Sequence, residues 1–192
     1  MKNNYRDNYP AILFSKLYIE NQMTDISVVN EGINADILFF GGLKRFANDV
    51  LGIKGIKYII VLMGVNDINI KNATSEKVIS GYKQLIKKSH EKKILIYEAT
   101  IMPFSRYKYK YLWNLNKEKP RNNVNNWIRK TKPLNGGFDA YFDFDKYMKD
   151  PLNSTSIGPF SDSGDRIHPG TDGYKKMVES INNLELFSKN LE

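Results

Sequence analysis

The sequence predicts a three-layer α/β/α protein built on a parallel β-sheet. Residues 57–63 and 93–99 form two almost continuously apolar runs, as expected of strands that are buried on both faces of such a sheet. A run with helical periodicity, residues 75–91, lies between them. Strands that alternate with helices pair in parallel through right-handed crossovers, so helices should cover both faces of the sheet.

The first elements expected are a helix over residues 10–18, a strand over residues 25–30 and a second helix over residues 43–51. Pro10 suits the start of the first helix, whose apolar residues recur at helical spacing. The run Asp-Ile-Ser-Val-Val-Asn is rich in β-branched residues, which favours the strand, and it leads into a turn over residues 31–36. The apolar face of the second helix consists of Leu43, Phe46, Ala47, Val50 and Leu51.

The strand over residues 57–63 leads into a polar turn, Gly-Val-Asn-Asp, at residues 64–67. Thr74 is the predicted N-cap of the helix over residues 75–91. His90 lies near the end of this helix, where the helix dipole favours an imidazole, and we expect it to be structural. The inner face of the helix consists of Val78, Tyr82, Leu85 and Ile86.

After the strand over residues 93–99, residues 103–120 form a long irregular segment rich in Tyr and Lys, of a length typical of a binding loop or lid. Its aromatic residues Tyr109, Tyr111 and Trp113 are expected to border a substrate pocket; the alternative is that they pack onto the core. The remaining expected elements are a helix over residues 124–128, a strand over residues 141–144, a loop over residues 150–164 and a final helix that begins with Pro169.

The stretch Asp-Arg-Ile-His-Pro at residues 165–169 contains one of only two histidines in the protein. If the carboxylate of Asp165 accepts from one nitrogen of His168, it fixes the imidazole tautomer and leaves the other nitrogen free as a base. The alternative is a turn whose aspartate merely caps the last helix. The turns that hold Gly32 and Asn66 follow predicted strands, so they should meet this pair at the carboxyl edge of the sheet, where α/β proteins bind their ligands.

Three blocks of the sequence resemble, in order, those of the SGNH or GDSL-type esterases and lipases. They are Val-Asn-Glu-Gly-Ile at residues 29–33, Gly-Val-Asn-Asp-Ile at residues 64–68 and the stretch at residues 165–169. The resemblance runs over nearly the whole chain and implies a flavodoxin-like parallel sheet and a hydrolytic Ser-His-Asp mechanism.

The same resemblance assigns roles to four residues. The Gly32 N–H and the Asn66 side-chain amide would be oxyanion-hole donors, His168 the general base and Asp165 the group that orients it. The alternatives are that Gly32 is a turn glycine with positive φ and that Asn66 is a turn or capping residue. Asp67 is interpreted as structural, a partner in an Asx-type turn.

One block of the family has no counterpart in this sequence. It is a first strand that ends in Gly-Asp-Ser and supplies both the nucleophile and an oxyanion donor. Neither Ser15, within a predicted helix, nor Ser27, within a predicted strand, suits the role of nucleophile. Ser161 and Ser163 lie on the same loop as His168, which is poor geometry for attack from the opposite wall of the site. The missing strand would run through the middle of the sheet. Its place is therefore filled from outside the chain, by homo-oligomerisation or strand exchange, or the flanking strands close up.

Two classes of function follow from these observations. The first is an ester hydrolase of the acyl-ester or deacetylase type, acting on a small ester or an acylated carbohydrate, whose start has been lost from the sequence and which is nearly inactive as written. The second is a non-catalytic relative that binds a carbohydrate or an acyl group. No cofactor or metal is expected in either case.

Composition bounds the remaining possibilities. A chain of 192 residues with 41% hydrophobic and 26% charged residues predicts a single domain over residues 1–190, with residues 191–192 as a candidate tag remnant. No apolar run approaches the roughly 18–20 residues that cross a bilayer, and the polar start does not read as a signal peptide. The absence of cysteine excludes disulfides and thiolate catalysis but does not identify the compartment.

The net charge of +8 raises the question of nucleic-acid binding. The lysines are scattered along several segments, the basic and aromatic patch at residues 106–111 is short, and no nucleic-acid motif accompanies it. We therefore expect a solvated basic surface and no nucleic-acid partner.

Overall fold

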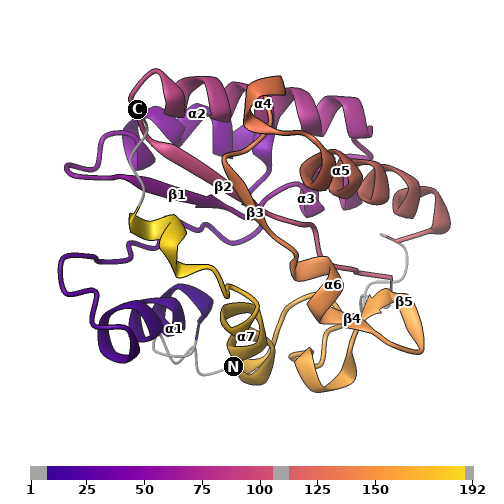
Figure 1. The fold of residues 1–192 in the computed structure, drawn as a ribbon. Coiled ribbons are helices and arrows are strands. Elements are labelled where there is room, and N and C mark those ends of the chain that lie inside the picture. The colour runs from indigo at the N-terminus through magenta and orange to yellow at the C-terminus, as the bar shows by residue number, and fades with distance from the viewer. Residues whose placement is uncertain (1–7, 106–112, 189–192) are drawn as a thin grey trace.

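The computed structural model describes residues 8–105 and 113–188 and confirms the predicted α/β architecture with a parallel sheet (Figure 1). Within these residues the central sheet has three parallel strands, which pair in chain order: β1 (Tyr58–Val61), β2 (Leu95–Ala99) and β3 (Ala140–Phe142). Tyr58 lies opposite Leu95, and Tyr97 lies opposite Ala140. Among the described strands, β1 is thus an edge strand, paired on one side only.

Helices make up the two outer layers. In chain order they are α1 (Tyr9–Ser15), α2 (Leu43–Arg45), α3 (Val65–Asn69), α4 (Ser75–His90), α5 (Glu118–Lys130), α6 (Phe144–Met148) and α7 (Thr171–Glu179). π-Helical turns extend α1 and flank α2, at Lys16–Glu20, Leu38–Gly42 and Phe46–Val50. Short 3-10 turns lie at Leu115–Lys117, Pro133–Asn135, Pro159–Ser161 and Leu184–Ser188. None of the described helices is long and apolar enough to cross a membrane.

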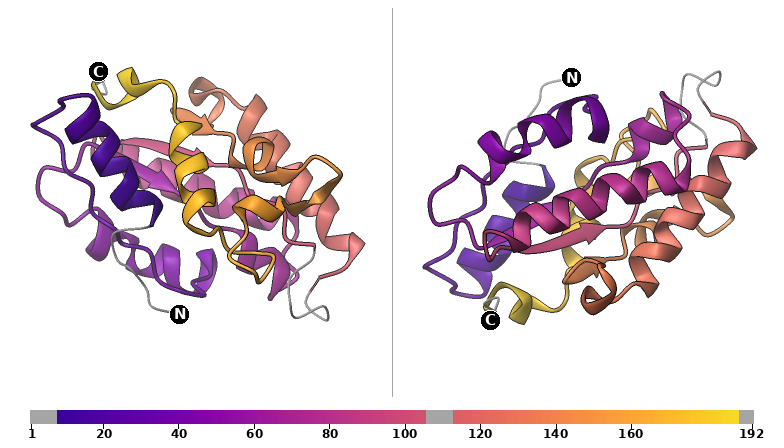
Figure 2. Two further views of the ribbon diagram at one scale, coloured as in Figure 1. Left: turned by 90° about the horizontal axis from the view of Figure 1, so that it is seen from below. Right: turned by 90° about the horizontal axis from the view of Figure 1, so that it is seen from above.

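The two helix layers bury opposite faces of the sheet (Figures 1 and 2). Ile59 and Val61 of β1 point into an upper core formed with α4, α5 and the turns around α2, whereas Tyr58 and Ile60 point into a lower core formed with α1, α6 and α7. This alternation is the two-faced burial expected of a parallel sheet. The lower layer is tied together by Lys16, whose Nζ donates to the carbonyl oxygens of Val178 (3.0 Å) and Ile181 (2.9 Å) beside α7.

The predicted strand over residues 25–30 is not a strand in the structure. These residues have no regular secondary structure, although their β-branched composition favours it. The physical reason is that a strand requires a ladder partner, and β1 lies across a cavity that both segments line. The flanking segments have therefore not closed up around the position of the missing strand.

Two further predictions are wrong at the C-terminal end. The expected loop over residues 150–164 contains an antiparallel hairpin of β4 (Lys149–Asp150) and β5 (Asn153–Ile157). Polar residues dominate β5, so its sequence carries little strand signal. Pro169 does not open the last helix, because the N-cap of α7 is Gly170, whose N–H donates to the carbonyl oxygen of Ser161 (2.9 Å).

The irregular segment predicted over residues 103–120 ends earlier than expected. A 3-10 turn begins at Leu115 and α5 begins at Glu118, so that Pro120 stands in the first turn of the helix. Proline is tolerated there because N–H groups of the first turn have no intrahelical acceptor. The expectation for Thr74 is confirmed, since its side chain accepts from Lys77 N–H at the start of α4 (3.3 Å).

Glu98, in the middle of the sheet, is a buried carboxyl without a hydrogen-bond partner. It lies opposite Val61, is fully buried, and neither of its side-chain oxygens is hydrogen-bonded within the described residues. The nearby Tyr82 hydroxyl donates instead to the Met63 carbonyl oxygen (2.8 Å). Burial raises the pKa of Glu98 well above its usual value of 4.5, because the core solvates the charged form poorly.

Replacing Glu98 with glutamine should remove a pH-dependent loss of stability. The pKa of Glu98 is higher in the folded chain than in the unfolded chain. Between these two pKa values the carboxyl is protonated in the folded chain and ionised in the unfolded chain. The free energy of unfolding therefore falls as pH rises through this window, by about 1.4 kcal/mol per pH unit. Urea unfolding of Glu98→Gln between pH 4 and 8 should lack this slope, and the exposed Glu179→Gln should retain it. Parallel curves for Glu98→Gln and the unaltered chain would contradict the prediction.

Candidate functional site

His168 and Asp165 form a hydrogen-bonded pair on the loop that precedes α7. The Nδ1 of His168 lies 2.6 Å from Oδ2 of Asp165. The other oxygen of Asp165 accepts from the backbone N–H groups of Ile167 (3.0 Å) and His168 (2.9 Å). One side chain therefore fixes both the turn and the orientation of the imidazole, which leaves Nε2 available as a base.

The electrostatics of the pair favour an ionised aspartate. Partial burial opposes ionisation, but the hydrogen bonds from the His168 side chain and from the backbone outweigh it and lower the pKa of Asp165 below its usual value. The side chain of His168 is 57% exposed, so the imidazole stands at the rim of the site and is open to solvent.

Residues in left-handed conformations bend the loop that carries this pair. Gly164 has φ +105°, and Arg166, a residue with a Cβ, has φ +71°. Asp162 holds Arg166 there, since its Oδ1 accepts from the Arg166 N–H at 2.8 Å. A non-glycine residue in this region of φ costs on the order of 1–3 kcal/mol, and such residues concentrate at functional sites.

Asn66 reaches the site from the turn after β1. Gly64 makes that turn with φ +100°, and a Cβ there would come within 2.8 Å of the Tyr82 hydroxyl. Asn66 then lies in the first turn of α3, and its Nδ2 donates to the carbonyl oxygen of Asp36 (3.0 Å). Asp67 is buried and accepts from Leu38 N–H (2.9 Å) through its side chain, consistent with a structural role.

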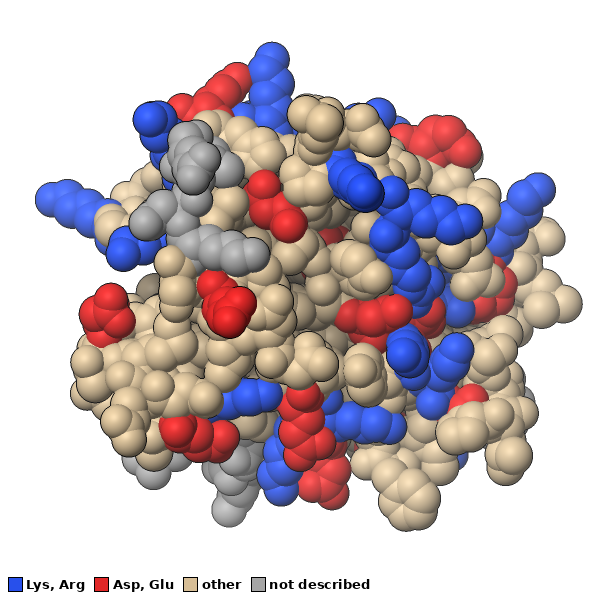
Figure 3. Space-filling model, in the orientation of Figure 1, with Lys and Arg blue, Asp and Glu red and all other residues tan. Residues whose placement is uncertain are grey.

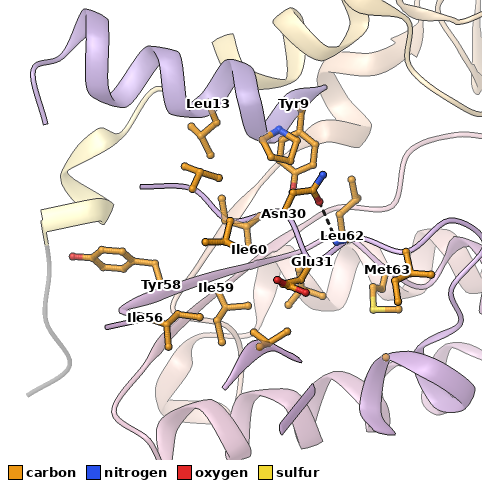
Figure 4. Close-up of a pocket in the computed structure, with 18 of the residues that line it drawn as sticks. Tyr9, Leu13, Asn30, Glu31, Ile56, Tyr58, Ile59, Ile60, Leu62 and Met63 are labelled. Atoms are coloured by element: carbon orange, nitrogen blue, oxygen red, sulfur yellow. Dashed lines mark hydrogen bonds between the residues drawn. The ribbon is translucent and has the colours of Figure 1, made fainter. Parts of the chain in front are cut away.

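Gly32 lies on the loop after residues 25–30, and its φ is not positive, so the alternative of a positive-φ turn glycine is wrong. Its N–H donates to Oδ1 of Asn30 (3.0 Å), the dashed line in Figure 4. Both candidate oxyanion donors, Gly32 and Asn66, are thus engaged with acceptors of the chain itself. In a structure without substrate, catalytic hydrogen bonds are often not yet formed, so this pairing does not exclude them as donors.

Arg45 and Asp36 support the Gly32 loop and were not identified from the sequence. Nε of Arg45 lies 2.8 Å from Oδ2 of Asp36, and Nη1 of Arg45 donates to the carbonyl oxygen of Glu31 (2.8 Å). These bonds link the helical segment around α2 to the loop that carries Gly32. The residues lie nine or more positions apart, so no local motif signals them.

A cavity of about 610 Å³ brings the predicted site residues together (Figure 4). Gly32, Asn66 and His168 all line it. The rest of its wall follows residues 25–35 on one side and residues 56–63 on the other, with Tyr9 and Leu13 of α1 pointing in from the lower layer. Because Asn66 follows the carboxyl end of β1, the predicted site residues Gly32, Asn66 and His168 lie at that end of the cavity.

Other residues named from the sequence lie elsewhere. Ser161 is buried, the Ser163 N–H donates to the His168 carbonyl oxygen (2.9 Å), and neither serine lines the cavity; Ser27 does line it, on the irregular segment. Trp113 packs against the upper core, 3.4 Å from Glu118 through its indole nitrogen, and does not line the cavity. Tyr109 and Tyr111 lie outside the described residues.

Two further features bear on the chemistry of the protein. No group of three or more His, Asp or Glu residues suited to a metal ion occurs in the parts of the chain that the structure describes. His90, as expected, has a structural partner, since its Nε2 lies 3.0 Å from Asp139. Basic and acidic side chains are interspersed on the face seen in Figure 3.

Comparison with known structures finds proteins of the same fold. A protein of the lipolytic G-D-S-L family from Desulfitobacterium hafniense DCB-2 matches with a TM-score of 0.69 at 22% identity, over 93% of this chain and 89% of that one. A GDSL-like lipase from Bacteroides thetaiotaomicron VPI-5482 matches with a TM-score of 0.72 at 16% identity, over 95% and 86%. An acetyl xylan esterase matches with a TM-score of 0.69 at 20% identity, over 92% and 89%.

These structural matches show a shared fold. No significant match was found among curated proteins. The sequence of residues 3–176, however, matches the GDSL-like lipase/acylhydrolase family, so the match covers most of the chain. Together with the α/β/α layers, this match establishes that the chain belongs to the GDSL-like lipase/acylhydrolase family.

Proposed function

We propose that this chain is the base-bearing part of an ester hydrolase, in which His168 and Asp165 activate a serine that the described residues do not provide. The observation that carries the proposal is the 2.6 Å contact between His168 and Asp165 at the rim of a cavity that Gly32 and Asn66 also line. Family membership supports hydrolysis as the reaction class.

In this mechanism, Nε2 of His168 removes the proton of a serine hydroxyl as its oxygen attacks the ester carbonyl. Asp165, ionised, stabilises the imidazolium that forms, and His168 then returns the proton to the leaving alcohol. A water molecule, activated by the same base, hydrolyses the resulting acyl-enzyme and restores the serine.

Gly32 and Asn66 would stabilise the negative charge that develops on the carbonyl oxygen. To do so, each must exchange its present acceptor, Oδ1 of Asn30 or the carbonyl oxygen of Asp36, for the substrate oxygen. One such donor contributes about 3–4 kcal/mol to the transition state. The likeness to an acetyl xylan esterase supports an acylated carbohydrate, or another small ester, as the substrate class.

The test is hydrolysis of 4-nitrophenyl acetate by the chain as it stands and by a version extended with an apolar strand that ends in Gly-Asp-Ser. The chain as it stands should remain near background, because loss of the serine alone typically costs about 10⁶ in turnover. The extended version should exceed it by several orders of magnitude, and a fluorophosphonate should label only the added serine. Stoichiometric labelling of Ser27, Ser161 or Ser163 in the unextended chain would show that the nucleophile has been misassigned.

A second candidate function is binding without catalysis. The observation that favours it is that the N–H of Gly32 and the amide of Asn66 are already paired within the chain. A binding relative would take up an acetylated xylo-oligosaccharide and leave it intact, even when the Gly-Asp-Ser strand is present. Calorimetric binding of that oligosaccharide without release of acetate by the extended version would therefore favour this candidate.

A further inference from the structure

At Ile60 and Leu62, the outer edge of β1 and of the residue that follows it carries backbone groups without partners among the described residues. The Lys57 carbonyl oxygen accepts from Leu95 N–H (3.0 Å), so alternate residues from Lys57 onward face β2. Along a strand, successive residues direct their N–H and C=O to opposite sides, and Ile60 and Leu62 therefore face away from β2. On that side, neither Ile60 nor Leu62 makes a backbone hydrogen bond within the described residues.

The opposite wall of the cavity has the same property. Residues 27–29, Ser-Val-Val, are strand-forming by composition, yet none of them makes a backbone hydrogen bond in the part of the chain that the structure describes. These residues and Ile60 and Leu62 line the same cavity. Two strand-like edges thus face one gap, and nothing described lies between them. Figure 4 labels a residue of each wall, Asn30 of one and Leu62 of the other.

The gap lies at the level of the sheet, between the two helix layers. Its lining includes Leu13, Leu17 and Met177 from the lower core and Phe46 and Leu85 from the upper core. Apolar side chains therefore line the gap on both faces of the sheet. A central strand of a parallel sheet, apolar on both faces, has this form.

We propose that this cavity is an acceptor site for one extended peptide that adds to β1 as a parallel strand and pairs with residues 27–29 on its other edge. A peptide is the occupant because it can supply N–H and C=O groups to Ile60 and Leu62, which an acyl chain cannot. To match residues 58–62 it needs about five residues, or about 16 Å, with apolar side chains on both faces.

The direction of the peptide connects the acceptor site to catalysis, and this step rests on the proposed function. All strands of the central sheet are parallel, and Asn66 follows the carboxyl end of β1. A parallel peptide therefore brings its own carboxyl end beside Gly32, Asn66 and His168. A serine directly after the strand would stand where Nε2 of His168 can remove its proton. The site is then completed by strand addition.

The test uses a synthetic decapeptide, Lys-Lys-Ile-Val-Val-Val-Gly-Asp-Ser-Ile, added to the whole chain. Binding is measured by calorimetry and by amide hydrogen exchange. Exchange at Ile60, Leu62 and residues 27–29 should slow by about 10-fold or more, whereas Ile59 and Val61, already paired with β2, should change little. Absence of binding, or binding without slower exchange at these amides, would overturn the proposal.

Matched peptides control for unspecific apolar binding without altering the fold of the protein. Versions that are N-methylated at alternate residues lose the donors of one edge at a time, and methylation of either edge should weaken binding by about 10-fold or more. Decanoic acid tests an acyl chain as occupant. If the methylated peptides bind as tightly as the parent peptide, or if decanoic acid displaces the peptide at a similar concentration, the cavity is assigned to an acyl chain. Protection of the same amides by concentration-dependent dimerisation without peptide would assign it to a second copy.

A peptide with alanine in place of serine separates this proposal from the proposed function. It should bind as tightly as the parent peptide but leave 4-nitrophenyl acetate hydrolysis at background. If the serine peptide protects the amides and yet gives no hydrolysis, the acceptor site stands and the proposed function fails. If a covalently extended chain hydrolyses the ester while no peptide binds, the proposed function stands and the acceptor site fails.

Discussion

In the chain extended by a strand that ends in Gly-Asp-Ser, replacing His168 with alanine is expected to reduce turnover of 4-nitrophenyl acetate by about 10⁶. The imidazole is the base that the geometry provides to the serine, and members of a triad act as a unit. The measurement is the steady-state turnover number, with folding checked by circular dichroism. His168 is exposed, and within the described residues its side chain hydrogen-bonds only to Asp165, so the fold should survive the change.

Variants of the neighbouring site residues should reduce turnover by smaller factors. Asp165→Asn should cost about 10⁴, because the imidazole loses the partner that sets its tautomer, and Asn66→Ala about 10²–10³, the value of one oxyanion donor. His90→Ala is the matched control, since the only other histidine pairs with Asp139 away from the cavity, and it should leave turnover unchanged. Equal turnover of His168→Ala and His90→Ala would refute the assignment of the base.

Replacing Arg121 with alanine is expected to lower the free energy of unfolding by about 3–5 kcal/mol, the usual cost of breaking a buried ion pair from one side. The side chain of Arg121 is 3% exposed and contacts Glu118 (2.8 Å) and Asp145 (2.5 Å). Its Nη1 also donates to the Ile101 carbonyl oxygen (3.1 Å), just beyond β2. Without the guanidinium, two carboxylates are left buried with fewer partners. Urea unfolding at neutral pH measures the change.

Lys175→Ala is the matched control for Arg121→Ala. Lys175 pairs with Asp172 at 3.2 Å, but both side chains are mostly exposed, so the loss should lie within about 0.5 kcal/mol. Arg121→Met, which keeps the volume of the side chain but not its charge, should be destabilising as well. If Arg121→Ala and Lys175→Ala destabilise the chain equally, the buried network around α5 and α6 does not contribute as proposed.

Much of the fold could be predicted because its signals are local. The apolar runs that become β1 and β2 are visible within a few residues of sequence, and the Thr74 cap and the periodicity that follows it define α4. The pair of Asp165 and His168 could be predicted equally well, since the two residues lie only three positions apart in one turn.

The features that the sequence did not predict depend on distant partners. Residues 25–30 have the composition of a strand but lack a neighbour to pair with. The hairpin of β4 and β5 is polar and is held in part by Ser105, whose N–H donates to the carbonyl oxygen of Thr155 (2.9 Å). The engagement of Asn66 with Asp36, thirty positions away, likewise leaves no trace in a local pattern.

The open edge of β1 also bears on synthesis of the protein in the cell. An uncovered strand edge is a template for unwanted association, and here α1 covers the lower side of it. Besides apolar packing, α1 is held there by Lys16, which follows the helix and donates to the carbonyl oxygens of Val178 and Ile181 near the other end of the chain. During translation α1 leaves the ribosome long before that anchor exists. The nascent chain, rather than the folded one, is therefore the form most exposed to aggregation, and early addition of a peptide strand to β1 would shorten that interval.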